Sequence, residues 1–367
     1  MNVNHHKKKV CFVSSSLSNG GAERALSNLL CNMDLSELDV SLVLLNKKIT
    51  YPIPEDINVI DLHKRSAIYL PLCFILLMVN LMKIKPDIVI SVWSFPSLLT
   101  GIALKLTRLK SKWIVRVANN PSDQEMGLKK RFFYWLYQHA TRYIVLCDEL
   151  KESFEQHYPF AKGRTHLIRN GFNIADLYEK ASEQLDDHIP PPYMISVGSL
   201  SQQKRYDVLL NAYALIPIEK RIPLVILGDG PLKNELLSLC KELDIESSVI
   251  FKGFVKNPYP YVINADIFTL ASDYEGLCNA AIEAQCLGIP AVITNCPTGN
   301  KEIVEDGVTG YLVPLRNAEI MAVKISQLLN DNQNRIQMSE NAKTLISKKY
   351  QIETSVEQLE SLLLQLT

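Results

Sequence analysis

Two glutamates, Glu275 and Glu283, are the residues whose type and spacing could most directly do chemistry, and they lie in the segment 272–283. A carboxylate can accept hydrogen bonds from two neighbouring hydroxyls. Glu283 could therefore hold the hydroxyls of a ribose, and Glu275 those of a second sugar. Alternatively, Glu275 caps a helix and Glu283 lies on the solvated face of that helix. The two glutamates alone do not distinguish this structural role from sugar binding.

The residues around Glu275 predict a helix N-terminus that suits a phosphate. An apolar, strand-like run over 267–270 leads into a polar turn, and we expect a helix from near Leu277. Its free N–H groups, with Leu277 and Cys278 as the donors, and the positive end of its dipole favour an anion. Gly276 would let the backbone approach that anion closely.

A second group of candidate residues follows the strand-like run 194–197. Gly198 comes directly after this run, and the basic residues Lys204 and Arg205 lie at the start of the next predicted helix. A lysine there is a suitable counter-charge for a diphosphate, although solvated surface lysines give the same pattern. Gly228 and Gly253 end the next two strand-like runs. Because ligands bind at the carboxyl ends of parallel strands, these turns predict a phosphate-binding edge.

The elements that must position these residues alternate between strand-like and helix-like along all 367 residues. This alternation predicts α/β units with parallel sheets covered by helices. A polar and then proline-rich stretch over 184–192 interrupts the pattern, so two domains are expected. We predict a first domain over 1–175, a second over 176–349, and a last helix over 350–367 that packs back on the first. The predicted strands are 10–14, 40–45, 88–92, 113–117, 143–146, 194–197, 224–227, 249–252, 267–270 and 291–294.

Composition excludes several classes of protein. The chain has zero formal net charge, 47% hydrophobic and 21% charged residues, which is typical of a folded globular protein. Its eight cysteines are scattered without metal-ligand spacing, which indicates reduced thiols in the cytoplasm. The apolar stretch 69–82 is shorter than a membrane span and predicts a buried or interfacial helix.

In their order and spacing, these motifs resemble the retaining glycosyltransferases of family 4, also called glycosyl transferases group 1. The resemblance covers nearly the whole chain and implies the GT-B architecture, in which two facing Rossmann-like domains enclose a cleft. The matching pieces are Gly20-Gly21-Ala22-Glu23-Arg24, Asn170–Asn173, Gly198 with Lys204, Gly228-Asp229-Gly230, Gly253, the Glu275/Glu283 pair, and the run 302–314.

The resemblance implies a role for each matched position. Lys204 would neutralise the donor diphosphate, Glu275 would hold the transferred sugar, and Glu283 would bind the ribose. The remaining donor-binding positions implied are Gly20 and Gly21 in the first domain, and Gly198, Arg205, Gly228, Gly253, Phe254, Val255, Gly276, Leu277 and Cys278 in the second.

Two departures from the family pattern affect the catalytic assignments. Ser199 stands where members often have Arg, and Arg205 is the nearest candidate substitute. Many members carry a His where this chain reads Arg116-Val-Ala-Asn-Asn-Pro121, so no residue takes the histidine's role directly. Arg116, Asn119 and Asn120 are the neighbours of that position, and Asn119 is the catalytic candidate among them. With Lys204 in place of a metal, and no Asp-x-Asp after a strand, we expect transfer that needs no cofactor or metal.

The stretch 105–142 predicts the acceptor side. Nine Lys or Arg residues oppose two acidic ones, and basic residues run into the aromatics of 132–137. This combination suits the anionic surface of a membrane, although a core-facing helix with a basic end would look alike. No nucleic-acid-binding motif accompanies the basic residues.

Taken together, these observations predict a transferase that moves a sugar from a nucleotide sugar to a lipid-linked oligosaccharide or surface polysaccharide precursor. UDP-hexose or UDP-N-acetylhexosamine is the expected donor, by resemblance of the turn 296–302. We expect the protein at the cytoplasmic face of the membrane. A GT-B epimerase or phosphorylase and a non-catalytic nucleotide-sugar-binding module are the alternatives.

Overall fold

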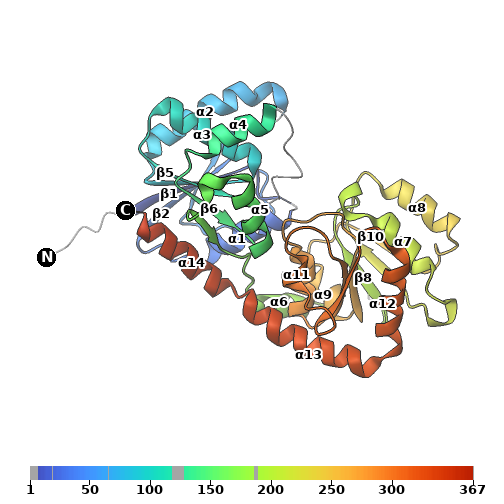
Figure 1. Ribbon diagram of the computed structural model, residues 1–367. Helices are drawn as coiled ribbons and strands as arrows, with labels where there is room; N and C mark the ends of the chain where they lie inside the picture. The colour runs from blue at the N-terminus through green and yellow to red at the C-terminus, as the bar shows by residue number, and fades with distance from the viewer. Residues whose placement is uncertain (1–6, 19, 65, 118–127, 186–188, 367) are drawn as a thin grey trace. The chain divides into compact units, whose positions relative to one another are not determined.

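The computed structural model describes residues 7–18, 20–64, 66–117, 128–185 and 189–366 (Figure 1). The chain forms two compact units, one of Met1–Gly171 with Ile352–Thr367 and one of Phe172–Gln351. Each unit has one sheet of parallel strands with helices packed on it. The predicted α/β fold class is confirmed, and the first unit ends at residue 171, where the sequence placed the boundary at 175.

The first unit is built on a seven-stranded sheet in the order β3-β2-β1-β4-β5-β6-β7. All neighbouring strands are parallel, and the order reverses direction between β1 and β4. The strands are β1 (Lys8–Ser14), β2 (Leu38–Leu44), β3 (Asn58–Asp61), β4 (Ile88–Val92), β5 (Lys112–Arg116), β6 (Arg142–Val145) and β7 (Thr165–Leu167).

Helices of the first unit cover both faces of this sheet (Figure 1). α1 and α14 share a hydrophobic cluster with the strands on one face, where Leu26 and Leu30 meet Leu359 and Leu363. α2, α3 and α4 pack on one another in sequence. The helices are α1 (Gly21–Asn32), α2 (Leu70–Ile84), α3 (Ser94–Thr107), α4 (Leu128–Tyr137), α5 (Asp148–His157) and α14 (Ile352–Gln365), with short 3₁₀ turns η1 (Ala67–Tyr69) and η3 (Pro159–Ala161).

The second unit is built on a six-stranded sheet in the order β10-β9-β8-β11-β12-β13, again with parallel neighbours. The strands are β8 (Met194–Val197), β9 (Leu224–Leu227), β10 (Val249–Gly253), β11 (Ile267–Leu270), β12 (Ala291–Thr294) and β13 (Gly310–Val313). The helices are α6 (Ile174–Ala181), α7 (Tyr206–Ala214), α8 (Lys233–Glu242), α9 (Tyr259–Ile263), α10 (Asn279–Cys286), α11 (Asn300–Ile303), α12 (Ala318–Asn330) and α13 (Asn332–Lys349), with 3₁₀ turns η4 (Gln202–Lys204) and η5 (Ile218–Lys220).

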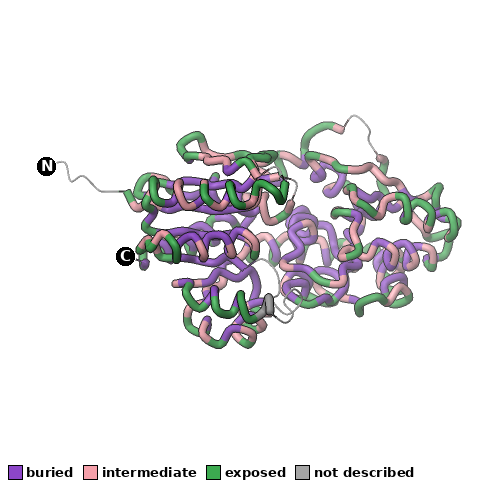
Figure 2. Tube along the Cα trace, turned by 90° about the horizontal axis from the view of Figure 1, so that it is seen from above, coloured by how far each residue is buried: buried purple, intermediate pink, exposed green. Residues whose placement is uncertain are grey.

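The local sequence explains where several of these elements begin. β9, β11 and β12 are buried at every residue, as continuous apolar runs in a parallel sheet should be, and Figure 2 shows buried chain inside each unit. The side chains of Asn173, Asn317 and Asp331 accept from the backbone N–H three residues later and so begin α6, α12 and α13.

The apolar helix of the first unit is longer and more exposed than the sequence predicts. η1 and α2 form a helical run over Ala67–Ile84 that is long and apolar enough to cross a membrane by length and composition. Only 17% of this run is buried. Ile68, Leu72 and Ile75 are 84%, 50% and 51% exposed, so a buried core helix, one of the two predicted readings, is wrong.

Candidate functional site

The predicted glycines of the second unit meet at the carboxyl edge of its sheet. The N–H of Gly198 donates to the carbonyl of Leu227 (2.9 Å), and the N–H of Gly228 donates to the carbonyl of Gly253 (2.7 Å). Gly228 has φ 148° and Gly253 has φ 73°, conformations that favour glycine. A Cβ on Gly228 would collide with the carbonyl oxygen of Gly198. The turns after β8, β9 and β10 therefore form one tightly packed edge.

Lys204 and Glu275 form a buried ion pair at this same edge. Lys204 Nζ lies 2.6 Å from Glu275 Oε1, with the side chains 15% and 7% exposed. Lys204 ends η4 after β8, and Glu275 follows β11. Since β8 and β11 are neighbours in the sheet, residues 71 positions apart are brought together. Ser272 Oγ donates to the same Oε1 at 2.6 Å.

The electrostatics of this pair keep Lys204 charged. Burial by itself lowers the pKa of a lysine, but the Glu275 carboxylate outweighs it, and the pKa of Lys204 is raised above its ordinary value. The site thus presents an ammonium group at neutral pH. Such a group can hold a phosphate oxygen without a metal ion.

The helix after Glu275 begins later than the sequence predicts. α10 starts at Asn279 with Cys278 as its N-cap residue, two residues after the predicted start near Leu277. Thr298 Oγ1 donates to the carbonyl of Glu275, which holds this carbonyl in a turn outside the helix. Gly276, Leu277 and Cys278 therefore form the loop that leads into α10.

Glu283 is a buried residue of α10 and is 3% exposed, which excludes the solvated position considered for it. Burial, followed by the Glu275 carboxylate and to a smaller extent Glu283, raises the pKa of Cys278 to about 12. Glu275 and Glu283 are thus both buried, in the loop before α10 and in α10 itself, where the sequence expects a sugar nucleotide.

Arg205 is engaged with carboxylates. Its guanidinium lies 2.7 Å from Asp207 Oδ2 and 3.5 Å from Asp273 Oδ2, and Arg316 also contacts Asp273 (2.9 Å). The hydrogen bond to Asp207 is the main reason that the pKa of Arg205 is raised. The charge of Arg205 is thus offset locally by these two carboxylates. Ser199 contributes a hydroxyl 3.3 Å from that of Ser201.

The remaining predicted positions lie where the sequence expects them along the chain. Phe254, after β10, is 56% exposed, and Val255 is partly buried, so both are accessible to a planar base. Gly20 is the N-cap of α1 and Gly21 its first residue. A Cβ on Gly20 would collide with the carboxylate of Glu23. Asn119 lies outside the described residues.

Sequence reasoning missed the residues that hold the Glu275 loop in place. Ser272 binds the Glu275 carboxylate, Thr298 binds its carbonyl, and Gln203 Nε2 donates to the carbonyl of Tyr274 (2.8 Å). Thr298 has a positive φ of 68°. Thr298 lies in the turn 296–302, whose polar residues Thr298 and Asn300 are the sequence signal for this contact.

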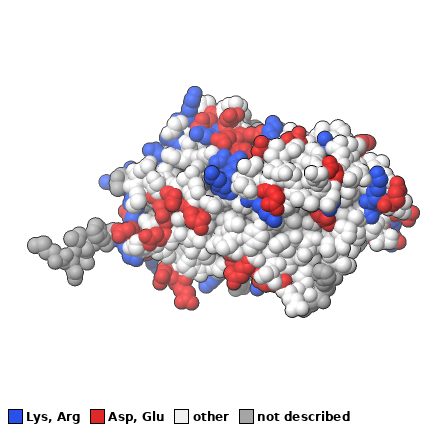
Figure 3. Space-filling model, turned by 90° about the horizontal axis from the view of Figure 1, so that it is seen from below, with Lys and Arg blue, Asp and Glu red and all other residues white. Residues whose placement is uncertain are grey.

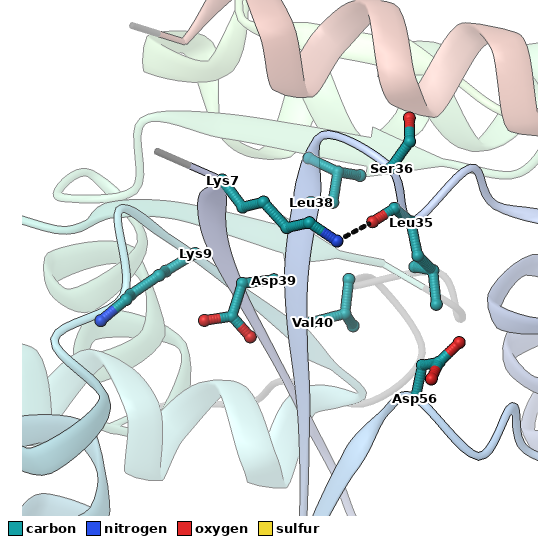
Figure 4. Close-up of a pocket in the computed structure, with 8 residues that line it drawn as sticks. All are labelled: Lys7, Lys9, Leu35, Ser36, Leu38, Asp39, Val40 and Asp56. Atoms are coloured by element: carbon teal, nitrogen blue, oxygen red, sulfur yellow. Dashed lines mark hydrogen bonds between the residues drawn. The ribbon is translucent and has the colours of Figure 1, made fainter. Parts of the chain in front are cut away.

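A cavity of about 630 Å³ lies elsewhere, at the amino ends of β1 and β2 (Figure 4). Lys7, Lys9, Asp39 and Asp56 line it together with apolar residues, and Lys7 donates to the carbonyl of Leu35 (2.9 Å). No predicted site residue lines it. Ligands of doubly wound sheets bind at the opposite, carboxyl edge, so this cavity is not the candidate active site.

Within the described ranges, no group of three or more His, Cys, Asp or Glu side chains could hold a metal ion.

Comparison with known proteins shows the family to which the chain belongs. The model "Glycosyltransferase Family 4" matches residues 19–176 and the model "Glycosyl transferases group 1" matches residues 179–345. A Campylobacter jejuni protein named N-acetylgalactosamine-N,N'-diacetylbacillosaminyl-diphospho-undecaprenol 4-alpha-N-acetylgalactosaminyltransferase is 30% identical over 90% of this chain and 92% of its own. The amylovoran biosynthesis glycosyltransferase AmsD of Erwinia amylovora is 26% identical over 89% of this chain and 92% of its own.

A solved structure gives the same fold. Anabaena HepE in complex with UDP matches 97% of this chain and 100% of its own with a TM-score of 0.78 and 20% identity. The two parallel α/β units and the two family matches define a glycosyltransferase of the GT-B architecture. More particularly, the chain belongs to the family 4 glycosyltransferases, the glycosyl transferases group 1. The predicted family, fold and enzyme class are confirmed.

Proposed function

We propose that this enzyme transfers one sugar from a UDP-sugar to a lipid-linked oligosaccharide or surface polysaccharide precursor, with retention of anomeric configuration. The observation that carries the proposal is the buried Lys204–Glu275 pair at the carboxyl edge of β8 and β11. It places a fixed cation and a hydroxyl-binding carboxylate in one site. The Campylobacter relative's name specifies an acceptor with a diphospho-undecaprenol group, and HepE has been solved with UDP-glucose.

The chemistry requires the site to stabilise the leaving nucleoside diphosphate. As the bond between the anomeric carbon and the diphosphate oxygen breaks, negative charge accumulates on that oxygen, and the Lys204 ammonium offsets it. Glu275 holds hydroxyls of the transferred sugar, and Glu283 those of the ribose. In a retaining transfer the acceptor oxygen bonds to the anomeric carbon from the face that the diphosphate leaves, and its proton passes to the departing diphosphate oxygen. This role of fixed charge requires no metal ion.

Turnover assays test this proposal. The protein is incubated with a panel of UDP-sugars and an undecaprenyl-diphosphate-linked saccharide, and UDP release and acceptor mass are measured. We expect UDP release that depends on the acceptor, and none with Glu275→Ala. Glu219→Gln, at an exposed glutamate of the same unit, is the matched control and should retain full activity. UDP release that is independent of acceptor would instead indicate an epimerase or hydrolase.

We also propose that the first unit binds the cytoplasmic face of the membrane through 105–142 and the helical run Ala67–Ile84. On α4, Phe132, Tyr134 and Trp135 are about 40% exposed, and Lys105 Nζ lies 3.8 Å from the centre of the Trp135 ring. α3 packs against both α2 and α4, so the aromatic and apolar side chains belong to one helical layer. By contrast, acidic and basic residues are interspersed on the face in Figure 3.

Flotation with liposomes that contain anionic lipid tests the membrane proposal. Ile75→Asp and Trp135→Ala should each reduce the bound fraction, because both remove exposed apolar surface that a bilayer would cover. Leu215→Asp, at a 55% exposed leucine of the second unit, is the control and should bind as the wild type does. Equal binding of all four proteins would refute this assignment.

A further inference from the structure

Arg116 is a buried arginine that the assigned site does not use. It is the last residue of β5, at the carboxyl edge of the first sheet, and is 4% exposed. Its Nη2 donates to Asn170 Oδ1 at 2.6 Å. Among the described residues, its Nε has no hydrogen-bond partner. A guanidinium has five N–H donors, so most of its donor capacity is left for a ligand.

No carboxylate offsets the charge of Arg116 in the part of the chain that the structure describes. Burial is the only cause that changes its pKa, which is lowered to about 10, so the group remains protonated at neutral pH. The contrast with Lys204 is direct, because that buried cation has Glu275 at 2.6 Å. Burying an unpaired charge disfavours folding. A site that retains one is suited to an anion that arrives with the ligand.

The strand register places Arg116 in a definite part of the first unit. Ile114, two residues earlier on β5, lies in the hydrophobic cluster shared with α1 and α14. Because side chains alternate along a strand, Arg116 faces the same side of the sheet. The Gly20-Gly21 turn that begins α1 lies on that side, after β1. β4 alone separates β1 from β5, which is about 10 Å at two strand spacings.

We propose that Arg116 is a diphosphate-binding residue, whose guanidinium takes phosphate oxygens of one of the two substrates. This inference rests on the proposed function, in which the donor carries a nucleoside diphosphate and the acceptor a lipid diphosphate. The planar fork of arginine matches the oxygens of a phosphate group, which favours this anion over a neutral sugar. Asn170 acts as a positioning residue that fixes one edge of the guanidinium.

Steady-state kinetics identify which diphosphate binds. Arg116→Gln should raise the KM for either donor or acceptor at least tenfold, and Arg116→Lys should restore part of the loss. A rise for the donor assigns the nucleoside diphosphate, and a rise for the acceptor assigns the lipid diphosphate. Arg169→Gln is the matched control, because Arg169 precedes Asn170 but is paired with Asp148 at 2.8 Å. Unchanged KM values, or no rescue by lysine, would overturn the proposal.

Thermal unfolding gives a readout that does not depend on transfer. Without ligand, Arg116→Gln should melt no lower than the wild type, because it removes an unpaired buried charge; a lower melting temperature would indicate a purely structural arginine. Inorganic pyrophosphate should raise the melting temperature of Lys204→Ala, in which the other counter-charge is missing, but not that of Lys204→Ala/Arg116→Gln. Equal shifts in the two, or none in either, would overturn the proposal. If pyrophosphate stabilises the protein through Arg116 as predicted but the wild type shows no sugar transfer, only the proposed transferase substrates are refuted.

Discussion

Removing either partner of the Lys204–Glu275 pair should destabilise the second unit far more than removing an ordinary surface pair. The side chains are 15% and 7% exposed, so Lys204→Met leaves a buried carboxylate whose remaining side-chain partner, within the described residues, is the Ser272 hydroxyl. Breaking a buried pair in this way costs about 3–5 kcal/mol. The unit has the size of a typical domain, and this loss corresponds to a decrease of roughly 6–20 °C in melting temperature.

A double-mutant cycle separates this effect from simple loss of packing. Lys204→Met/Glu275→Leu removes both charges and should be closer in stability to the wild type than either single variant, because no uncompensated charge remains. The Lys180–Asp176 pair is the control, since its distance is 2.7 Å but both side chains are 44% exposed. Lys180→Met should cost about 0–1 kcal/mol.

The cycle is measured by urea unfolding at pH 7. Because the pKa of Lys204 is raised in the folded protein, its contribution is complete below the unfolded value of about 10.4 and is lost only as the pH rises through the higher folded value. Strictly additive single and double variants, or a cost for Lys204→Met as small as that for Lys180→Met, would refute the reasoning.

Three further predictions concern the loops at the carboxyl edge of the second sheet. Thr298→Val should lower the free energy of unfolding by about 1–3 kcal/mol, because the buried carbonyl of Glu275 loses the hydrogen bond from Thr298. It should also lower kcat/KM for the nucleotide sugar. Unchanged urea unfolding and unchanged kinetics would contradict this prediction. Gly228→Ala should prevent stable folding because there is no space for its Cβ. Gly163→Ala is the control: it has open space around its Cβ at φ 75°, so it should lower the free energy of unfolding by only about 1 kcal/mol. Thermal melts followed by circular dichroism compare the two variants. At pH 8 the buried Cys278 thiol of the native protein should resist alkylation, whereas the exposed Cys31 should react. Mass spectrometry measures the extent of modification at each cysteine, and equal modification of the two would contradict a Cys278 pKa of about 12.

The central strands of both sheets were predictable because parallel strands buried on both faces read as continuous apolar runs. Three strands were missed, namely β3, β7 and β13, and each lies at the edge of its sheet. Edge strands are short and only partly buried, as the four residues of β3 show, so their sequences lack the apolar run. When only one face of a strand is buried, three or four residues give too few apolar positions for the strand to be recognised from its sequence.

The candidate site was predictable as a set of residues but not as a geometry. Glu275 and Lys204 were recognisable from their turns, whereas the ion pair between them arises because β8 and β11 are neighbours in the sheet. The hydrogen bond from Thr298 to the carbonyl of Glu275, twenty-three residues earlier in the chain, was likewise not readable from either turn. The contact of Arg116 with Asn170 likewise depends on strand order, which spacing along the chain does not encode.

A crystal structure of the protein with UDP bound is the most direct test of the account. We predict that the diphosphate lies against Lys204 Nζ at the carboxyl edge of β8 and β11, with the ribose hydroxyls on Glu283. UDP bound in the cavity lined by Lys7 and Lys9, or a diphosphate out of reach of Lys204, would contradict the proposed site.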